Sequence, residues 1–264
     1  MYPASYCGRH YDGNIVTEAI GWKQQGRIDE EEFRHIEDIA EPCPGSCAML
    51  GTANTMSALS ESLGMSLMGS STIPAVLAAR MAKGVETGEK IVELVQKGVT
   101  TRDILTEEAF ENAVMHLLTM GGSTNGILHL QAIYHEAGLG ELPLSVFDEF
   151  SRRIPQVASI YPASEFDMVD FYEGGGVPAV LKEIEEYLHK DTLTVSGLTM
   201  GEALSRFSYT NNRNMIKTAE EPFAPTGGVA ILKGNIAPLG CVIKPAAVPK
   251  HMFRYSGRAQ VFTT

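Results

Sequence analysis

Residues 105–130 read LTEEAFENAVMHLLTMGGSTNGILHL and predict two helices joined by a short turn. Thr106, followed by two glutamates, is a typical residue to precede a first helical turn, because its hydroxyl can accept a free backbone N–H there. Apolar residues then recur at helical spacing, which indicates a helix with a buried side. Gly121 and Gly122 end this first helix.

The turn that follows, GGSTN (Gly121–Asn125), combines glycines with polar side chains. Ser123, Thr124 and Asn125 can cap a second helix that continues to Gly138. A helix start with two hydroxyls and an amide can also hold a carboxylate or a phosphate. The local pattern favours the simpler interpretation, a tight turn between helices, and leaves the anion site as the alternative.

Helical spacing predicts further helices on both sides of this pair, separated by turns rich in Gly and Pro. After about residue 222 the pattern changes, because VAILKGN and CVIKPAAV are short β-branched runs that predict strands. Helices early and strands late indicate an α/β chain. The other predicted helices are 14–22, 29–39, 52–63, 88–96, one that begins at Ser145, and 178–189.

Composition and charge exclude several classes of protein. The 264 residues are 44% hydrophobic, enough for a sizeable core, and the net charge of −11 without a basic run argues against a nucleic-acid partner. The longest apolar stretches, such as 113–120, are shorter than the roughly 20 residues that span a bilayer. The N-terminus lacks the apolar centre of a signal peptide. We therefore expect a cytoplasmic protein with no membrane partner.

The densest candidate for chemistry is residues 42–56, PCPGSCAMLGTANTM. Cys47 comes directly before a predicted helix, a position where the positive end of the helix suits a thiolate ligand. Cys43 and Cys47 could form half of a zinc or iron–sulfur site, but no second pair with similar spacing exists in the chain. The pattern alone favours idle or buried thiols, and four cysteines are too few for a disulfide scaffold.

Other motifs give little support to alternative chemistries. No GxSxG or HExxH motif is present, which argues against the common hydrolases and zinc proteases. The glycines 174–176 lack the spacing of a phosphate-binding loop and are expected to be structural. His129, alone in an apolar stretch, is expected to be a core residue rather than a catalyst.

Four ordered segments carry a resemblance to a known family. They are CPGSCAMLGTANTMSALSESLGMSL (43–67), LTEEAFENAVMHLLTMGGSTNGILHL (105–130), EGGGVPAVL (173–181) and PTGGVAILKGNIAPLGCVIKPAAV (225–248). In this order they resemble the dihydroxy-acid dehydratase/6-phosphogluconate dehydratase family. The ending PTGGVAILKGNIAP is more similar to the dihydroxy-acid dehydratases, whereas GTANTM also occurs in sugar-acid dehydratases.

The resemblance implies a hydro-lyase that removes water from a 2,3-dihydroxy carboxylic acid to give a 2-keto acid in branched-chain amino-acid synthesis. Its family cofactors are an iron–sulfur cluster, 2Fe-2S or 4Fe-4S, whose open iron binds the leaving hydroxyl as a Lewis acid, and Mg²⁺. Cys47 matches a family cluster ligand, and five further residues would line the region near the cluster: Asn54, Thr55, Ser123, Thr124 and Asn125. Its partners would be a small dihydroxy acid and, at full length, a second subunit in a homodimer.

The resemblance also implies a fold, and it shows which family motifs this chain lacks. Residues 1–222 would form part of an α/β domain with helices around a parallel sheet, and residues 223–264 would begin a β-barrel domain. The family's cysteine-aspartate-lysine motif, an earlier cluster cysteine, the base and the Mg²⁺ ligands have no counterpart in this chain. We therefore expect an internal fragment that by itself assembles no stable cluster and has little activity.

Three alternatives remain open from the sequence. A sugar-acid dehydratase acting on an aldonate or 6-phosphogluconate would belong to the same family. A non-catalytic remnant would keep the α/β fold as a subunit or binding module. A zinc-binding module has the weakest support, because Cys43 and Cys47 have no nearby histidine pair to complete a tetrahedral set.

Overall fold

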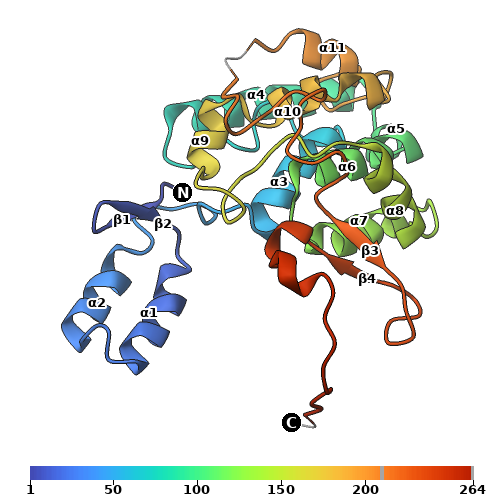
Figure 1. Ribbon diagram of the computed structural model, residues 1–264. Coiled ribbons are helices and arrows are strands. Elements are labelled where there is room, and N and C mark those ends of the chain that lie inside the picture. The colour runs from blue at the N-terminus through green and yellow to red at the C-terminus, as the bar shows by residue number, and fades with distance from the viewer. Residues whose placement is uncertain (209–210, 263–264) are drawn as a thin grey trace.

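The computed structural model describes residues 1–208 and 211–262 and is dominated by helices (Figure 1). The predicted helices are confirmed in kind, and most of their bounds differ by one or two residues. The segment 88–96 belongs to a longer helix, and the segment 178–189 is a helix followed by a 3-10 turn at Glu185–Tyr187. The helices at 101–104, 168–173 and 200–205 were not predicted. The α-helices are α1 (Ile15–Gln24), α2 (Glu30–Ile39), α3 (Thr52–Ser62), α4 (Ala78–Lys97), α5 (Thr101–Ile104), α6 (Glu107–Met120), α7 (Asn125–Glu136), α8 (Leu144–Arg153), α9 (Met168–Glu173), α10 (Gly176–Glu183) and α11 (Met200–Ser205).

Helix α6 lies at the centre of the molecule, with α3, α7, α8 and α10 packed around it. Every residue from Ala109 to Met120 is buried except Glu111, so the helix is buried on all sides rather than on one stripe. Its polar residues have partners in the core. Asn112 Nδ2 donates to the His189 carbonyl at 3.0 Å, and Thr119 Oγ1 donates to the Pro155 carbonyl at 2.7 Å.

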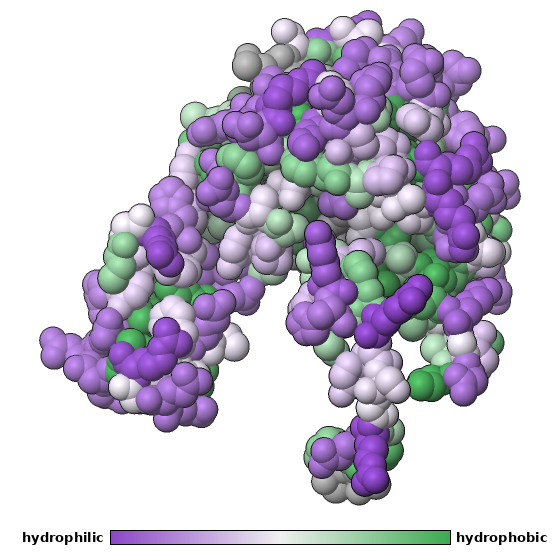
Figure 2. All heavy atoms as spheres, in the orientation of Figure 1, coloured by the Kyte–Doolittle hydropathy of each residue, from purple (hydrophilic) through white to green (hydrophobic). Residues whose placement is uncertain are grey.

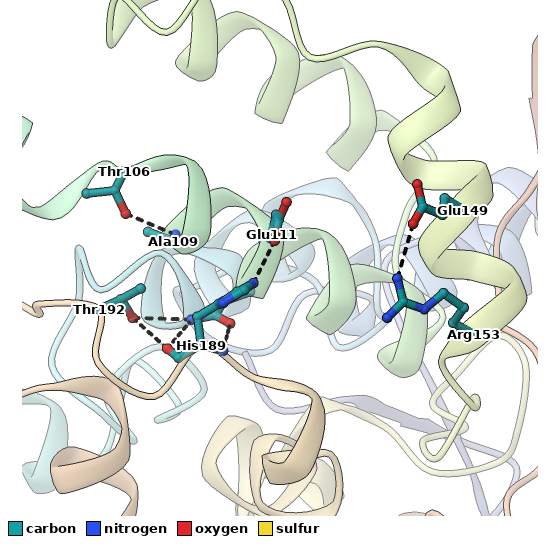
Figure 3. Close-up of polar contacts among 8 residues, drawn as sticks. Thr106, Ala109, Glu111, Glu149, Arg153, His189 and Thr192 are labelled. Carbon is teal, nitrogen blue, oxygen red and sulfur yellow. Dashed lines mark hydrogen bonds and ion pairs between the residues drawn. The ribbon is translucent and has the colours of Figure 1, made fainter.

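The ends of α6 follow the sequence signals. Thr106 Oγ1 accepts the Ala109 N–H at 3.3 Å, as Figure 3 shows. Gly121 has a φ of 64°, a left-handed conformation in which its N–H bonds back to the helix. The predicted end of the helix at Gly121 is therefore confirmed. The physical reason is that a residue with a Cβ would be strained in this left-handed conformation.

An N-terminal unit stands apart from the main body, and Figure 2 shows a wide hollow between the two. It consists of α1 and α2 and of an antiparallel hairpin that the sequence patterns did not predict, β1 (Ala4–Tyr6) and β2 (Arg9–Tyr11). Ile15, Ala19 and Ile36 form a small core of their own in this unit. The strands were missed because three residues are too few to show an alternating pattern.

The C-terminal strands β3 (Ala230–Leu232) and β4 (Cys241–Ile243) pair antiparallel, as a second two-stranded sheet. Strand β3 packs on α8, where Ser151 Oγ donates to the Val229 carbonyl at 2.6 Å. The predicted strands after residue 222 are thus confirmed, whereas the early part of the chain is not helical throughout, because the hairpin of β1 and β2 precedes α1. The parallel sheet expected between the helices is absent from residues 1–208 and 211–262, since the helices pack directly on the fully buried α6.

No helix within the described part of the chain is both long enough and apolar enough to cross a membrane. The longest one, α4, has 20 residues and carries charged side chains along its length.

Candidate functional site

The Cys47 loop (residues 40–51) joins α2 to α3. Backbone hydrogen bonds connect it to two other segments of the chain. The Leu50 N–H donates to the Tyr161 carbonyl, and the Met168 N–H donates to the Ala48 carbonyl, both at 2.8 Å. Asn54, in the first turn of α3, donates from Nδ2 to the carbonyls of Cys47 and Met49, both at 2.7 Å. Asn54 therefore fixes the half-buried Cys47 directly in front of the α3 N-terminus.

The N-termini of α3 and α7 meet through polar side chains that are about 70 residues apart in the sequence. Thr52 Oγ1 lies 3.3 Å from Ser123 Oγ and accepts a hydrogen bond from Asn125 Nδ2 at 2.8 Å. The Asn125 N–H also donates to Ser123 Oγ at 3.3 Å, so Ser123 caps α7. The Gly126 and Ile127 N–H groups at the start of α7 donate to the Ser123 and Thr124 carbonyls. The N-terminus of α3 and the exposed Asn125 amide are therefore the parts of this junction that suit a carboxylate.

Thr55 and Thr124 lie in different environments. Thr55 is buried, and its Oγ1 accepts the Ser123 N–H at 3.0 Å, so it joins α3 to the GGSTN turn rather than lining an open site. Thr124 precedes α7 but makes no side-chain capping bond. A Cβ on Gly122 would lie 2.8 Å from Leu117 Cδ1, which explains why glycine is needed where the turn meets the core.

Thr52 belongs to this cluster but was not among the predicted site residues. The signal that could have found it is its position as the first residue of α3, directly after the loop that carries the cysteine. The prediction that His129 is a core residue was wrong, because His129 lies exposed on α7. The buried histidine at the centre of the molecule is His116 on α6.

The cysteines do not gather into a ligand set. All four are free thiols, and Cys43 Sγ accepts the Tyr2 N–H at 3.2 Å. Across residues 1–208 and 211–262, no group of three or more His, Cys, Asp or Glu side chains could hold a metal ion. An iron–sulfur cluster is usually held by four protein ligands. These residues therefore do not by themselves match either a cluster or a Mg²⁺ site.

A polar cavity of about 140 Å³ lies beside Asn54. Its walls come from the cysteine loop, from α3, from the turn 71–75 and from the start of α4. Hydroxyl, amide and guanidinium groups dominate its lining, which suits an oxygen-rich anionic molecule. The polar side chains are Ser46, Asn54, Ser57, Ser71, Thr72 and Arg80.

Glu61 holds the turn that forms one wall of this cavity. Its fully buried carboxylate accepts the Gly69 N–H at 2.7 Å and the Ser71 N–H at 2.6 Å. Burial raises the pKa of Glu61 to about 7, although the hydrogen bonds and the charge of Lys83 act in the opposite direction. Glu61 is thus a positioning residue for the turn and titrates near neutral pH.

We expect Glu61→Gln to remove a decline of stability with rising pH. The folded chain holds the Glu61 proton from pH 4.5 up to about 7, where the unfolded chain has lost it. The contribution of Glu61 to the free energy of unfolding therefore falls over this range, by on the order of 3 kcal/mol, and the stability of the wild type relative to Glu61→Gln should fall by this amount as the pH rises. Urea unfolding between about pH 5 and pH 8 measures the slope. The exposed Glu186→Gln should keep the wild-type decline, and an unchanged slope in Glu61→Gln would contradict the assignment.

A second depression, of about 430 Å³, lies between α6, α8 and the segment before His189 (Figure 3). Four of its side chains form two pairs: His189 Nε2 lies 2.6 Å from Glu111 Oε2, and Arg153 Nη1 lies 3.1 Å from Glu149 Oε1. None of the predicted site residues lies in it. We assign it no part in the candidate site.

Two family models match the chain. The model described as Dihydroxy-acid/6-phosphogluconate dehydratase N-terminal matches residues 3–203. The corresponding C-terminal model matches residues 214–264.

Proteins named dihydroxy-acid dehydratase are similar to nearly the whole chain. The one from Caldanaerobacter subterraneus subsp. tengcongensis is 47% identical over 257 residues, which are 97% of this chain and 46% of that protein. The one from Ignicoccus hospitalis is 47% identical over 265 residues, 99% of this chain and 47% of the relative. The one from Halothermothrix orenii is 44% identical over 264 residues, which are 99% of this chain and 48% of that protein.

The chain spans about half the length of the curated relatives it matches. The resemblance seen in the four sequence segments is nevertheless confirmed. Because the N-terminal family model alone matches residues 3–203, the chain belongs to the dihydroxy-acid/6-phosphogluconate dehydratase family.

Proposed function

We propose that the protein to which these residues belong is a hydro-lyase that removes water from a 2,3-dihydroxy carboxylic acid to give a 2-keto acid. The observation that carries the proposal is the meeting of the α3 and α7 N-termini, through Thr52, Ser123 and Asn125, beside the Cys47 loop. The names of the relatives support a dihydroxy-acid substrate. In this proposal the polar cavity, the N-terminus of α3 and the Asn125 amide receive the acid's oxygen atoms.

The chain's own residues have defined tasks in this proposal. Asn54 keeps the cysteine loop closed on α3, and Glu61 keeps the wall turn in place, so both orient the site without transferring a proton. The helix N-terminal N–H groups favour a negatively charged carboxylate. Cys47 supplies one ligand of an iron–sulfur cluster, and the remaining cluster ligands and those of Mg²⁺ come from outside these 264 residues.

The organisation proposed for the whole protein follows the family. Residues 1–222 form part of the N-terminal dehydratase domain, and residues 223–264 begin a C-terminal β-barrel of which β3 and β4 are the first strands. The two family models divide the chain at a nearby position, between residues 203 and 214. We further propose that the complete protein acts in the cytoplasm as a homodimer.

Turnover by the complete protein tests the function. The coding sequence that contains these residues is expressed anaerobically, and 2-keto acid formation is measured from 2,3-dihydroxyisovalerate and, separately, from gluconate. Faster formation from 2,3-dihydroxyisovalerate is the expected result. Preference for gluconate would move the protein to the sugar-acid dehydratases, and no keto acid from either compound would support a non-catalytic remnant.

A further inference from the structure

One side of α3 connects the Cys47 loop to the turn at residues 69–75. Asn54, Ser57 and Glu61 follow one another at intervals of three and four residues, which places them on the same side of the helix. Asn54 bonds to the Cys47 loop, and Glu61 bonds to two N–H groups of the turn. The polar cavity lies between these two attachments, and Ser57 lines it. Helix α3 thus fixes two walls of the cavity.

Thr72, in the middle of this turn, carries a hydroxyl group without a hydrogen-bond partner. The residue lines the polar cavity and is only 8% exposed. Within residues 1–208 and 211–262 its hydroxyl takes part in no hydrogen bond. Buried hydroxyl groups normally have a partner, because an unpaired one loses its bonds to water and gains nothing in exchange. The Thr72 hydroxyl therefore indicates a ligand atom beside it.

Two cavities border Thr72, and their charges differ. The second one, of about 330 Å³, lies beside Gly175 and has the Glu173 carboxylate in its lining, which disfavours an anion there. The polar cavity has no Asp or Glu among the described residues that line it. A negatively charged ligand would therefore meet Thr72 from the polar cavity.

Gly176, in the segment EGGGVPAVL, leaves the room that the Thr72 hydroxyl occupies. A Cβ at this position would lie 2.7 Å from Thr72 Oγ1, and the φ of Gly176 is 59°, in the left-handed region. Both observations explain why glycine is needed here. This family segment therefore shapes the wall of the cavity.

Arg80 supplies a positive charge to the polar cavity. Its Nη1 donates to the Ser70 carbonyl at 2.7 Å, so the turn that Glu61 holds also orients the guanidinium. Arg80 forms no ion pair with any residue that the structure describes. Its remaining N–H groups are available to a ligand, and their planar arrangement suits a carboxylate. Arg80 also lies in the first turn of α4, where the helix dipole favours an anion.

We propose that the Thr72 hydroxyl and the Arg80 guanidinium bind the carboxylate of the substrate acid, and that Arg80 makes the site selective for an anion. The inference rests on the proposed function and deepens it, because it assigns the carboxylate to the polar cavity. The N-terminus of α3 and the Asn125 amide are then left for the hydroxyl groups of the acid.

An unreactive acid and its uncharged amide test this assignment on the complete protein. 2-Hydroxyisovalerate keeps the carboxylate but lacks the 3-hydroxyl that would leave, and 2-hydroxyisovaleramide also lacks the charge. Arg80→Gln should raise the dissociation constant of the acid at least about 10-fold, because charge-assisted hydrogen bonds are lost, and should change that of the amide by less than about twofold. Calorimetric titration measures both constants. Lys97→Gln removes the same charge from the other end of α4 and should change neither.

Thr72→Val separates binding from folding. Loss of the hydroxyl should raise the dissociation constant of the acid by about 10-fold. The free energy of unfolding should stay the same or rise, because the substitution breaks no hydrogen bond within the chain. Thr72→Ser keeps the hydroxyl and should keep most of the affinity.

Three results would overturn the inference. They are unchanged binding of the acid in Arg80→Gln or Thr72→Val, equal losses for acid and amide in Arg80→Gln, and a wild type that binds neither compound. Keto-acid formation by the wild type reports separately on the proposed function, because the calorimetric comparison does not require turnover.

Discussion

Cys47→Ser is expected to reduce the iron content of the complete, anaerobically reconstituted protein and to lower 2-keto acid formation by at least about 100-fold. Even residues that only orient a ligand typically change metal affinity or activity by about 10–100-fold, and the loss of a thiolate ligand should exceed this. The position of Cys47 supports the effect, because Asn54 holds the loop by two hydrogen bonds and fixes the thiol in front of α3.

Cys43→Ser is the matched control for this prediction. Its thiol is four residues away and accepts the Tyr2 N–H, a bond that a serine hydroxyl can also accept. Iron content and turnover should therefore stay near the wild-type values. Full iron content in Cys47→Ser, or equal losses in both variants, would show that Cys47 is not a cluster ligand.

The second large effect is loss of stability in acid, caused by His116. This side chain is fully buried on α6, and its Nδ1 lies 3.0 Å from Ser62 Oγ. Ser62 already donates its hydroxyl hydrogen to the Leu59 carbonyl at 3.1 Å, so its oxygen accepts and the Nδ1 atom carries the histidine proton. The Nε2 atom, buried and without a hydrogen-bond partner, would receive the second proton.

Burial lowers the pKa of His116 from 6.5 to about 3. Between these values the unfolded chain binds a proton that the folded chain does not, so the free energy of unfolding falls as the pH falls from 6.5 towards 3. The full effect is on the order of 4 to 5 kcal/mol, a large part of the stability of a domain. Denaturant unfolding at a series of acidic pH values measures it.

His116→Leu is expected to be less sensitive to acid than the wild type. The substitution keeps an apolar side chain of similar size in the core, and Ser62 keeps its bond to the Leu59 carbonyl. His129→Leu, on the exposed face of α7, is the matched control and should retain the acid sensitivity of the wild type. If both variants lose stability in acid as steeply as the wild type, His116 is not the group responsible.

Local signals predicted the elements of this fold well. Thr106 and Gly121 mark the ends of α6, and Gly138, with a φ of 81°, follows α7 as expected. These signals act within about four residues, because capping depends on side chains bonding to the nearest free backbone groups. The first fifty residues were predicted less completely, since the strands of the N-terminal hairpin are too short to show a period.

The candidate site could be predicted only in part. The position of Cys47 before a helix is visible in the sequence, and so is the polar GGSTN turn. The contact of Ser123 with Thr52 joins residues 71 positions apart, and it depends on α3 and α7 packing closely where Gly126 meets Thr55. Thr55 is buried between α3 and the GGSTN turn, a position that no local pattern gives, because such patterns do not tell which side of α3 faces α7.

The sequence by itself determined the ends of helices with clear caps, such as α6 and α7, which cysteine precedes α3, and the family to which the chain belongs, because each of these depends on neighbouring residues or on ordered motifs. The tertiary structure alone decided that α6 is buried on all sides, that His116 loses its access to water, and that Met81, Val85 and Val95 of α4 lie exposed. The physical reason is that burial depends on which surfaces meet, and amphipathic spacing defines a face without defining its partner.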